Sequence, residues 1–220
     1  MLDFTSTFNK YETLVQGVEK SVKQIRESHP EGIRCIRQCS DCCYAVFDLS
    51  LIESVYINYH FYQSLDKEKQ EQVLERAEGA DRKFYRIKRQ LHKMMVQQNK
   101  KEEEALQLMA AERVRCPFLN ESDLCDLYES RPVTCRVYGV PTAIQGAGHT
   151  CGKSGFKEGV LYPTINLDRI NLRLFGLSEE MLREIGSKEQ QLQMRLLPLS
   201  TSLLTDYDEA FFGLKLTCSV

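Results

Sequence analysis

The sequence predicts a mostly α-helical fold, and three observations support that prediction. Apolar residues recur at steps of three and four over long stretches, which is the spacing of an amphipathic helix. The chain shows no alternation of strand and helix patterns of the kind that builds a parallel sheet. Proline and glycine are concentrated in one central region, residues 113–155. At 220 residues the chain can bury a substantial core without crosslinks, so we expect a helical fold interrupted by two irregular loop segments.

The first predicted helix covers residues 3–27. Seven apolar side chains recur there at alternating steps of four and three residues, so they lie along one face. The sequence SHPEG ends the helix, because Pro30 and Gly32 both oppose its continuation. Such an apolar face is either buried within the chain or packs against the same helix of a second copy. Homodimerisation through this helix is therefore an open alternative. The seven residues are Phe4, Phe8, Tyr11, Val15, Val18, Val22 and Ile25.

Residues 50–112 form the second predicted helical part. Ser50 opens it as an N-cap and Glu53 reaches back from three residues on, which is the pattern of a capping box. From about residue 66 to residue 111 the chain is rich in Lys, Glu, Gln, Ala, Leu and Met. This composition favours one long helix or two helices in series. The apolar face of this stretch contains Phe84, Ile87, Leu91 and Met94.

Helical signals return after residue 165. Ser178 is predicted to cap a helix that begins at EEMLREIG, and a further helical stretch is predicted near KEQQLQMR. We expect a single domain over residues 1–220. Its parts are an N-terminal amphipathic helix in 1–30, a cysteine-cluster region in 33–155 with inserted helices in 50–112, and a C-terminal helical part in 156–220.

The chain contains nine cysteines, and four of them fall within the polar loop CIRQCSDCC. The spacing C-x3-C-x2-C-C includes the pair Cys39 and Cys42, whose two intervening residues let one tight turn aim two sulfurs at one metal. Cys42 and Cys43 point apart because successive side chains diverge. The adjacent pair therefore indicates either two neighbouring metal centres or one ligand with one supporting thiol. The four residues are Cys35, Cys39, Cys42 and Cys43.

A second set of four cysteines follows at wide spacing, C-x8-C-x9-C-x15-C, in the region rich in Pro and Gly. These spacings are too wide for one zinc knuckle, but they suit ligands that return to the first loop after the intervening helices. A structural Zn²⁺ or a cubane iron–sulfur cluster uses four protein thiolates. We therefore expect the two loop segments to converge on a metal or cluster site. The predicted ligands are Cys35, Cys39, Cys42, Cys43, Cys116, Cys125, Cys135 and Cys151.

Simpler explanations apply to some of these residues. Cysteine also serves as a small buried apolar residue, which accounts for Cys218 but not for four thiols in one polar loop. We expect Gly152 to donate its N–H to the Cys151 sulfur, and His149 to be a polar loop residue instead of a ligand. Five arginines near the cysteines either offset the charge of a thiolate site or lie on the ordinary surface. They are Arg34, Arg37, Arg115, Arg131 and Arg136.

The stretches CIRQCSDCC and RCPFLNESDLCDLYESRPVTCRVYG together resemble the YkgJ-like cysteine-cluster family, of the CxxCxxCC type. The resemblance covers about residues 35–151 and includes Glu53, ten positions after the double cysteine. It implies a zinc- or iron-chelating domain with eight cysteines. The chain departs from the family pattern at its first spacing, C-x3-C instead of C-x2-C, which makes Cys35 the least secure ligand. A related segment occurs in flagellin lysine methylase, an iron–sulfur protein, but a shared segment does not transfer an activity.

These observations predict a metal-binding protein. An iron–sulfur cluster of the 4Fe-4S type is the favoured cofactor because cluster proteins tolerate scattered ligands, with zinc or mononuclear iron as alternatives. Such a protein acts in redox chemistry, in metal handling or in assistance to a modification system. Two other functions stay open. One is an enzyme with an iron site whose open corner binds a protein or small-molecule substrate, as in a methylase-associated modification, and the other is a structural zinc module for protein interaction.

Charge and composition bear on the remaining partners. A net charge of -2 is no signature of nucleic-acid or membrane binding. Arg82, Arg86, Arg89 and Lys93 form a basic stripe, but the acidic run 102–104 follows at once, so we expect a solvated helix face and no nucleic acid. The sequence opens without a secretory leader, and no apolar run is long enough to span a membrane. We expect a cytoplasmic protein with free thiols, and a protein partner stays open.

Overall fold

Helices dominate the computed structural model, and the predicted mostly α-helical fold is confirmed. Part of the predicted helix over residues 66–111 lies outside the described residues, and so does Cys218. Among the described helices, none is long and apolar enough to cross a lipid bilayer. The structure describes residues 2–36, 38–98, 104, 108 and 111–214.

The described part of the chain forms α-helices, short 3₁₀ helices and two small sheets. The α-helices described are α1 (Thr5–Ser28), α2 (Leu51–Ser64), α3 (Lys67–Gln98), α5 (Val133–Val137), α6 (Leu167–Glu184) and α7 (Leu199–Leu204). The 3₁₀ helices are η1 (Pro30–Gly32), η2 (Asp41–Tyr44) and η3 (Gln190–Met194). Strands β1 (Asp48–Leu49) and β5 (Leu197–Pro198) form one antiparallel pair. Strand β2 (Thr142–Ile144) lies between β3 (Ala147–His149), which is antiparallel to it, and β4 (Ile165–Asn166), which is parallel to it.

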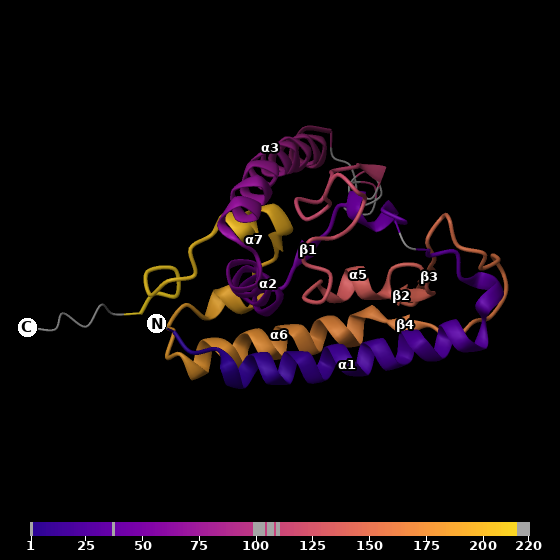
Figure 1. Ribbon diagram of the computed structural model, residues 1–220, viewed down its shortest axis with the longest axis horizontal. Helices are drawn as coiled ribbons and strands as arrows, with labels where there is room; N and C mark the ends of the chain where they lie inside the picture. The colour runs from indigo at the N-terminus through magenta and orange to yellow at the C-terminus, as the bar shows by residue number, and fades with distance from the viewer. Residues whose placement is uncertain (1, 37, 99–103, 105–107, 109–110, 215–220) are drawn as a thin grey trace, which may run out of the picture.

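The first helix is the one that the sequence predicted. It begins and ends within two residues of the expected bounds, and the chain leaves it just before Pro30. All of the predicted apolar face is buried except Phe4, which precedes the helix and is half-buried. Figure 1 shows α1 and α6 running side by side along one edge of the molecule, and the two helices are in contact. The apolar face of α1 is therefore covered within the chain, by α6, α2 and α5.

Ser50 and Glu53 form the predicted capping box at the start of α2. The Glu53 carboxylate accepts hydrogen bonds from the Ser50 N–H at 3.2 Å and from the Ser50 hydroxyl at 2.8 Å. Glu53 itself is buried, although it is a charged residue. This prediction succeeded because a capping box depends on residues only three apart in the sequence.

Ser178 does not cap its own helix, which corrects the prediction. Helix α6 begins twelve residues earlier than expected, at Leu167, and the Asn166 side chain caps it by accepting from the N–H of Arg169 at 2.9 Å. Ser178 lies fully buried in the middle of α6. Its hydroxyl accepts a hydrogen bond from the N–H of Ile52 at 3.1 Å, so it satisfies a free N–H at the start of α2.

A second apolar cluster lies between α2, α3 and α7 and borders the cysteine region. Phe61 and Phe118 lie in it with ring centroids 6.0 Å apart. Cys116 and Cys125 pack against this cluster. The cluster therefore gives these two cysteines of the second set an apolar support.

The central region is more regular than the sequence suggested. It contains α5 and the hairpin β2–β3, where irregular loop was expected. Gln145 and Gly146 both have positive φ, 50° and 78°, which is the geometry of a two-residue hairpin turn. The stretch near KEQQLQMR forms the 3₁₀ helix η3 and not an α-helix.

Candidate metal centre

A cavity of about 630 Å³ lies against α5 and is lined by cysteines of both loop segments. All of these cysteines are free thiols. Within the residues that the structure describes, no three His, Cys, Asp or Glu side chains stand in an arrangement that holds a metal ion. The cavity contains the predicted ligands on its walls, and their grouping around a metal stays a prediction. The lining cysteines are Cys35, Cys39, Cys42, Cys43, Cys116, Cys125, Cys135 and Cys151.

The first loop turns sharply at its cysteines. Gln38 has a positive φ of 69°, and the Cys39 N–H donates to a carbonyl three residues back at 3.0 Å. The 3₁₀ helix η2 then carries Cys42 and Cys43. These two tight turns explain how four thiols so close in sequence all reach the walls of one cavity.

The double cysteine is joined directly to the start of the second set. The Cys116 N–H donates to the Cys43 carbonyl at 2.7 Å, and the Val114 N–H donates to the Tyr44 carbonyl at 3.1 Å. These bonds form a short antiparallel pairing between segments that are separated in sequence by α2 and α3. They fix the distance between the first loop and the second without any help from a metal.

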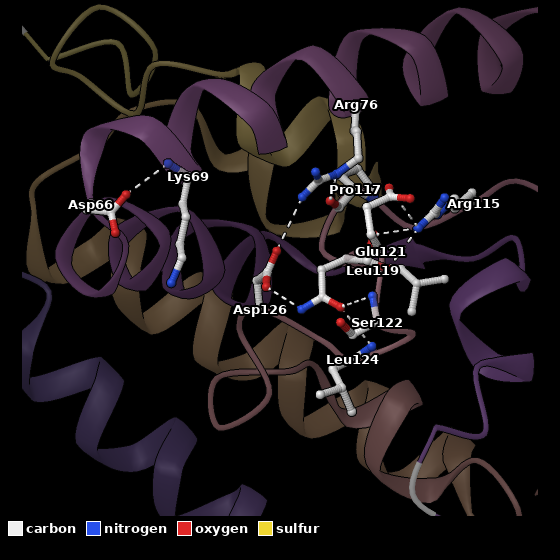
Figure 2. Close-up of polar contacts among 11 residues, drawn as sticks. Asp66, Lys69, Arg76, Arg115, Pro117, Leu119, Glu121, Ser122, Leu124 and Asp126 are labelled. Atoms are coloured by element: carbon white, nitrogen blue, oxygen red, sulfur yellow. Dashed lines mark hydrogen bonds and ion pairs between the residues drawn. The ribbon is translucent and has the colours of Figure 1, made fainter.

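The loop from Cys116 to Cys125 is held by a polar network that Figure 2 shows in close-up. Arg76, from α3, donates to the Pro117 carbonyl at 2.7 Å and pairs with Asp126 at 3.3 Å. One helix thereby clamps both ends of the loop, each end next to a cysteine.

The inside of the same loop is closed by Asn120. Its side-chain oxygen accepts from the N–H groups of Ser122 and Leu124, at 2.9 and 3.1 Å, and its amide donates to Asp126 at 2.8 Å. Arg115 donates to the carbonyls of residues 119 and 120 at 3.1 and 2.9 Å. Because its guanidinium is used in this way, Arg115 is a loop-organising residue.

Glu53 positions the helix that carries Cys135. Besides capping α2, its carboxylate accepts from the Val133 N–H at 3.0 Å, which is the first N–H of α5. Burial raises the pKa of Glu53, although hydrogen bonds from Val133 and Ser50 oppose the shift. Glu53, the acidic residue of the family pattern, is not among the described residues that line the cavity. It connects the helical core to the Cys135 segment.

The Cys151 segment returns to the start of the first loop. The Gly155 N–H donates to the Gly32 carbonyl at 2.8 Å, so the chain after Cys151 lies against the chain before Cys35. The N–H that bonds to the Cys151 sulfur belongs to Lys153, at 3.4 Å. The prediction that Gly152 is this donor is therefore wrong by one residue.

Gly139 lies directly against Cys35. Its φ is +94°, a conformation that side chains disfavour. A Cβ atom built on Gly139 would also collide with the Cys35 sulfur. The Cys35 thiol itself lies 4.0 Å from the carbonyl oxygen of Tyr138. Cys35 thus has defined neighbours on the cavity wall, even though it is exposed to solvent.

Asp41 is a residue of the cavity that the sequence argument missed. It lines the cavity between the first-loop cysteines, with only 14% of its side chain exposed. Burial opposes its ionisation, but hydrogen bonds from Lys153 and Arg113 hold the pKa of the Asp41 carboxyl below its usual value. Its position inside the C-x2-C turn is a signal that could have identified it.

Burial is the main cause of the raised pKa of the Cys116 and Cys135 thiols. It raises the pKa of Cys116 to about 12 and the pKa of Cys135 well above its ordinary value, and neighbouring thiols add to both shifts. For Cys42, a hydrogen bond with the Cys43 thiol is the largest cause of a raised pKa, followed by burial. Only a thiolate binds a metal, so a metal entering this cavity must displace protons.

Arg131 supplies a positive charge on the cavity wall. Its guanidinium stacks on the Tyr128 ring, 3.7 Å from the ring centroid, and 18% of its side chain is exposed. Its Nε is buried and has no hydrogen-bond partner among the described residues. Its charge acts to lower the pKa of Cys42, Cys125 and Cys135. A set of soft sulfur donors beside a fixed cation fits a thiolate-bound metal or cluster.

The other predicted neighbours have different roles. Arg136 is buried and bonded to Glu19 and to the carbonyls of Glu129 and Arg131, so it connects α5 to α1. His149 is exposed on strand β3, not in a loop, and is absent from the described cavity wall. Arg37 lies outside the described residues.

Comparison with known proteins gives one match. A family model described as "CxxCxxCC: Putative zinc- or iron-chelating domain" matches residues 34–152, which is more than half of the chain and includes all eight cysteines of the cavity. No curated protein and no solved structure matches the chain. The resemblance noted in the sequence is confirmed, and this chain belongs to the CxxCxxCC family of zinc- or iron-chelating domains.

Proposed function

We propose that the protein binds its metal through the cysteines of the cavity, and that the bound species is an iron–sulfur cluster of the 4Fe-4S type. One observation carries this proposal: eight free thiols from segments far apart in sequence line a single cavity. Buried cysteines that serve only as small apolar residues have no reason to gather in this way.

The surroundings of the thiols support a cluster. Thiolates from scattered positions are the usual ligands of such clusters, and burial and nearby charge set their reduction potentials. When bound, the cluster would supply one-electron transfer. The protein's own part is to hold the thiolates together, to keep Arg131 beside them and to limit access of solvent from the side of the Phe61 and Phe118 cluster.

The biological role that follows is redox chemistry, metal handling or assistance to a modification system. Free thiols in such number persist in a reducing compartment, which favours the cytoplasm. We also propose that residues 1–220 act as one domain, since α1, α2, α5 and α6 share one apolar cluster.

Anaerobic purification with quantification of iron, acid-labile sulfide and zinc tests the proposal. We expect a brown protein that contains iron and sulfide in equal amounts. Cys42→Ser should lose most of the iron, whereas Cys218→Ser, remote in sequence from both cysteine sets, should retain it. A colourless protein with stoichiometric zinc would replace the cluster by zinc and keep the thiolate site. A protein that binds neither metal would contradict the proposal.

A further inference from the structure

A second hollow of the molecule, a groove of about 1190 Å³, lies between α1 and α6 and shares no lining residue with the cysteine cavity. Figure 1 shows the two helices side by side along one edge of the molecule. Thr7, near the start of α1, donates to Glu184, at the end of α6, at 2.7 Å. The helices are therefore antiparallel, and the groove follows their length.

The groove has the dimensions of a helix-binding site. Its lining runs from Lys10 to Ser28 along α1 and from Asn166 to Glu180 along α6. At a rise of 1.5 Å per residue these stretches are about 27 Å and about 21 Å long. A third α-helix of about 14 to 18 residues has the same length. The groove can therefore hold such a helix along the first two.

Two glycines inside the helices keep the groove open. A Cβ atom on Gly17 of α1 or on Gly176 of α6 would meet nothing within 4 Å, and neither glycine has a positive φ. The backbone conformation thus does not require glycine at either position, although glycine destabilises a helix interior relative to alanine. Because the distance between packed helices depends on the side chains at the contact, these glycines allow another helix to approach closely.

The hydroxyl groups of α1 that line the groove are turned back onto their own helix. Each donates to the carbonyl four residues earlier, at 2.9 Å for Thr13, 3.1 Å for Ser21 and 2.8 Å for Ser28. The apolar part of the lining includes Leu172 of α6, which is 70% exposed. Apolar surface bordered by polar residues is typical of a protein interaction site.

The unpaired charge of the groove is positive. Its charged lining residues, among those described, are Lys10, Arg169, Arg173 and Glu180. Lys10 and Glu180 form an ion pair with each other at 2.5 Å. Arg169 and Arg173 are exposed, four residues apart on α6, and have no ion pair among the described residues. A second copy of the chain would bring the same arginines together, whereas an acidic partner complements them.

We propose that the groove between α1 and α6 binds an amphipathic α-helix of a separate, acidic partner protein. The apolar side chains of that helix lie between α1 and α6, and its carboxylates lie beside Arg169 and Arg173. Recognition of a helix in a groove uses apolar residues three, four and seven positions apart. The inference goes beyond the proposed function, because it gives the protein a docking surface in which no metal takes part.

A synthetic peptide tests the groove on the full chain. The peptide is about 16 residues long, with leucine at helical spacing on one face and glutamate on both sides of that face. Fluorescence anisotropy of the labelled peptide measures binding. We expect saturable binding that weakens as the salt concentration rises. A second peptide, in which lysine replaces every glutamate, should bind at least about 10-fold more weakly.

Gly176→Leu tests whether the peptide occupies the groove. The new side chain enters open space, so the fold should be retained while the groove is filled. We expect binding of the glutamate peptide to weaken at least about 10-fold. Gly79→Leu is the matched control, because Gly79 is also a helical glycine whose Cβ would meet nothing within 4 Å, but it lies on α3 and does not line the groove. Circular dichroism checks that both variants are folded.

Reversal of the two arginine charges tests the chemistry of the partner. The double variant Arg169→Glu, Arg173→Glu should bind the glutamate peptide at least about 10-fold more weakly and the lysine peptide more tightly than the unmodified chain does. A structural role for the arginines would not reverse the preference between the peptides. Arg86→Glu, at an exposed position on α3, is the control and should change neither affinity.

Three results would overturn the inference. The first is that the glutamate peptide does not bind, or binds Gly176→Leu as well as it binds Gly79→Leu. The second is that both peptides bind equally well to the unmodified chain. The third is that sedimentation shows a dimer of the unmodified chain that Gly176→Leu dissociates, because a second copy then occupies the groove. Each of these results leaves metal binding by the cysteines, which metal analysis measures, unaffected.

Discussion

The helical core and the cysteine cavity keep their shapes by different means. The core formed by α1, α2 and α6 consists of interlocking apolar side chains, many of them fully buried. The cavity is instead enclosed by backbone hydrogen bonds, tight turns and polar clamps such as Arg76 with Asp126. Its walls include Cys42, Cys116 and Cys135, whose pKa is raised by burial and by neighbouring thiols.

This difference indicates which region depends on metal. Apolar burial contributes about 25 cal/mol per Å² regardless of any cofactor, so the core should be stable in the metal-free chain. The cavity lacks such a filling, and metal binding should order it. Changes in the core should therefore alter stability, and changes at the cavity should alter metal binding.

The largest effect is expected from Met181→Ala in α6. Met181 is fully buried in the core, so its truncation should lower the free energy of unfolding by about 2–5 kcal/mol. Chemical denaturation of the metal-free chain measures this, with Leu172→Ala on the same helix as the control, since Leu172 is 70% exposed. The amount of metal bound by the folded variant should not change. A loss of metal from a folded Met181→Ala protein would show that the two regions are not separable.

Glu53→Gln acts where the two regions meet. The carboxylate serves α2 and α5 at once, and removing one of its acceptor oxygens should cost about 1–3 kcal/mol. Because α5 carries Cys135, the same variant should also weaken metal binding. Denaturation and metal titration of one preparation measure both effects, with the exposed Glu71→Gln as control. A loss of stability with full metal affinity would limit Glu53 to the core.

Comparing Gly139→Ala with Gly146→Ala separates the effect of backbone strain from the effect of contact with a cysteine. Both Gly139 and Gly146 have positive φ, but only a Cβ on Gly139 meets the Cys35 sulfur. Alanine at either position should cost about 1 kcal/mol in stability. Only Gly139→Ala should reduce metal binding by Cys35, as measured by anaerobic titration of the metal-free chain with Co²⁺. Equal metal binding by the two variants would argue against Cys35 as a ligand.

Arg131→Met removes a cation from the cavity wall, together with its ion pair to Glu19 of α1 at 3.9 Å. Loss of a charge that favours thiolates should weaken metal binding about 10-fold and lower the reduction potential of a bound cluster. Competition with a chelator and electrochemistry measure these quantities. Arg82→Met on the exposed face of α3 is the control. Unchanged affinity and potential would limit Arg131 to its contacts with Tyr128 and Glu19.

The smallest predicted effect is a pH dependence of the stability of the helical core. Burial lowers the pKa of His60 below its usual value of 6.5. The centroid of its ring lies 4.2 Å from the centroid of the Tyr56 ring. Since the folded state favours neutral imidazole, its contribution to stability is complete above pH 6.5 and is lost as the pH falls. Denaturation of the metal-free chain should show a small loss below pH 6.5 that His60→Gln removes and the exposed His92→Gln does not. A loss that persists in His60→Gln would assign it to other groups.

The sequence allowed the helical core to be predicted because its signals are local. The apolar face of α1 and the capping box of Ser50 and Glu53 each depend on residues a few positions apart. Ser178 shows where this approach fails. Its hydroxyl acts on α2, far away in the sequence, and no local pattern reports such a contact. The hairpin at Gln145 was missed because its turn residues lack the Asn-Gly or Asp-Gly signal.

The site divides in the same way. Cysteine spacing predicted which thiols line the cavity, because spacing is visible in the sequence. It did not predict the contacts of Cys151, whose segment lies against that of Gly32 and whose thiol lies 3.9 Å from the Asp41 Oδ2 atom. The orientation of Asp41 depends likewise on Arg113 and Lys153, which come from two other segments.

X-ray absorption spectroscopy at the metal edge of the anaerobically purified full chain tests the central claim most directly. If the cavity thiols bind the metal, the nearest shell of scatterers consists mainly of sulfur at about 2.3 Å, with iron–iron scattering where a cluster is present. A nearest shell made of nitrogen and oxygen alone, on a protein that contains stoichiometric metal, would contradict the claim that these cysteines are the ligands.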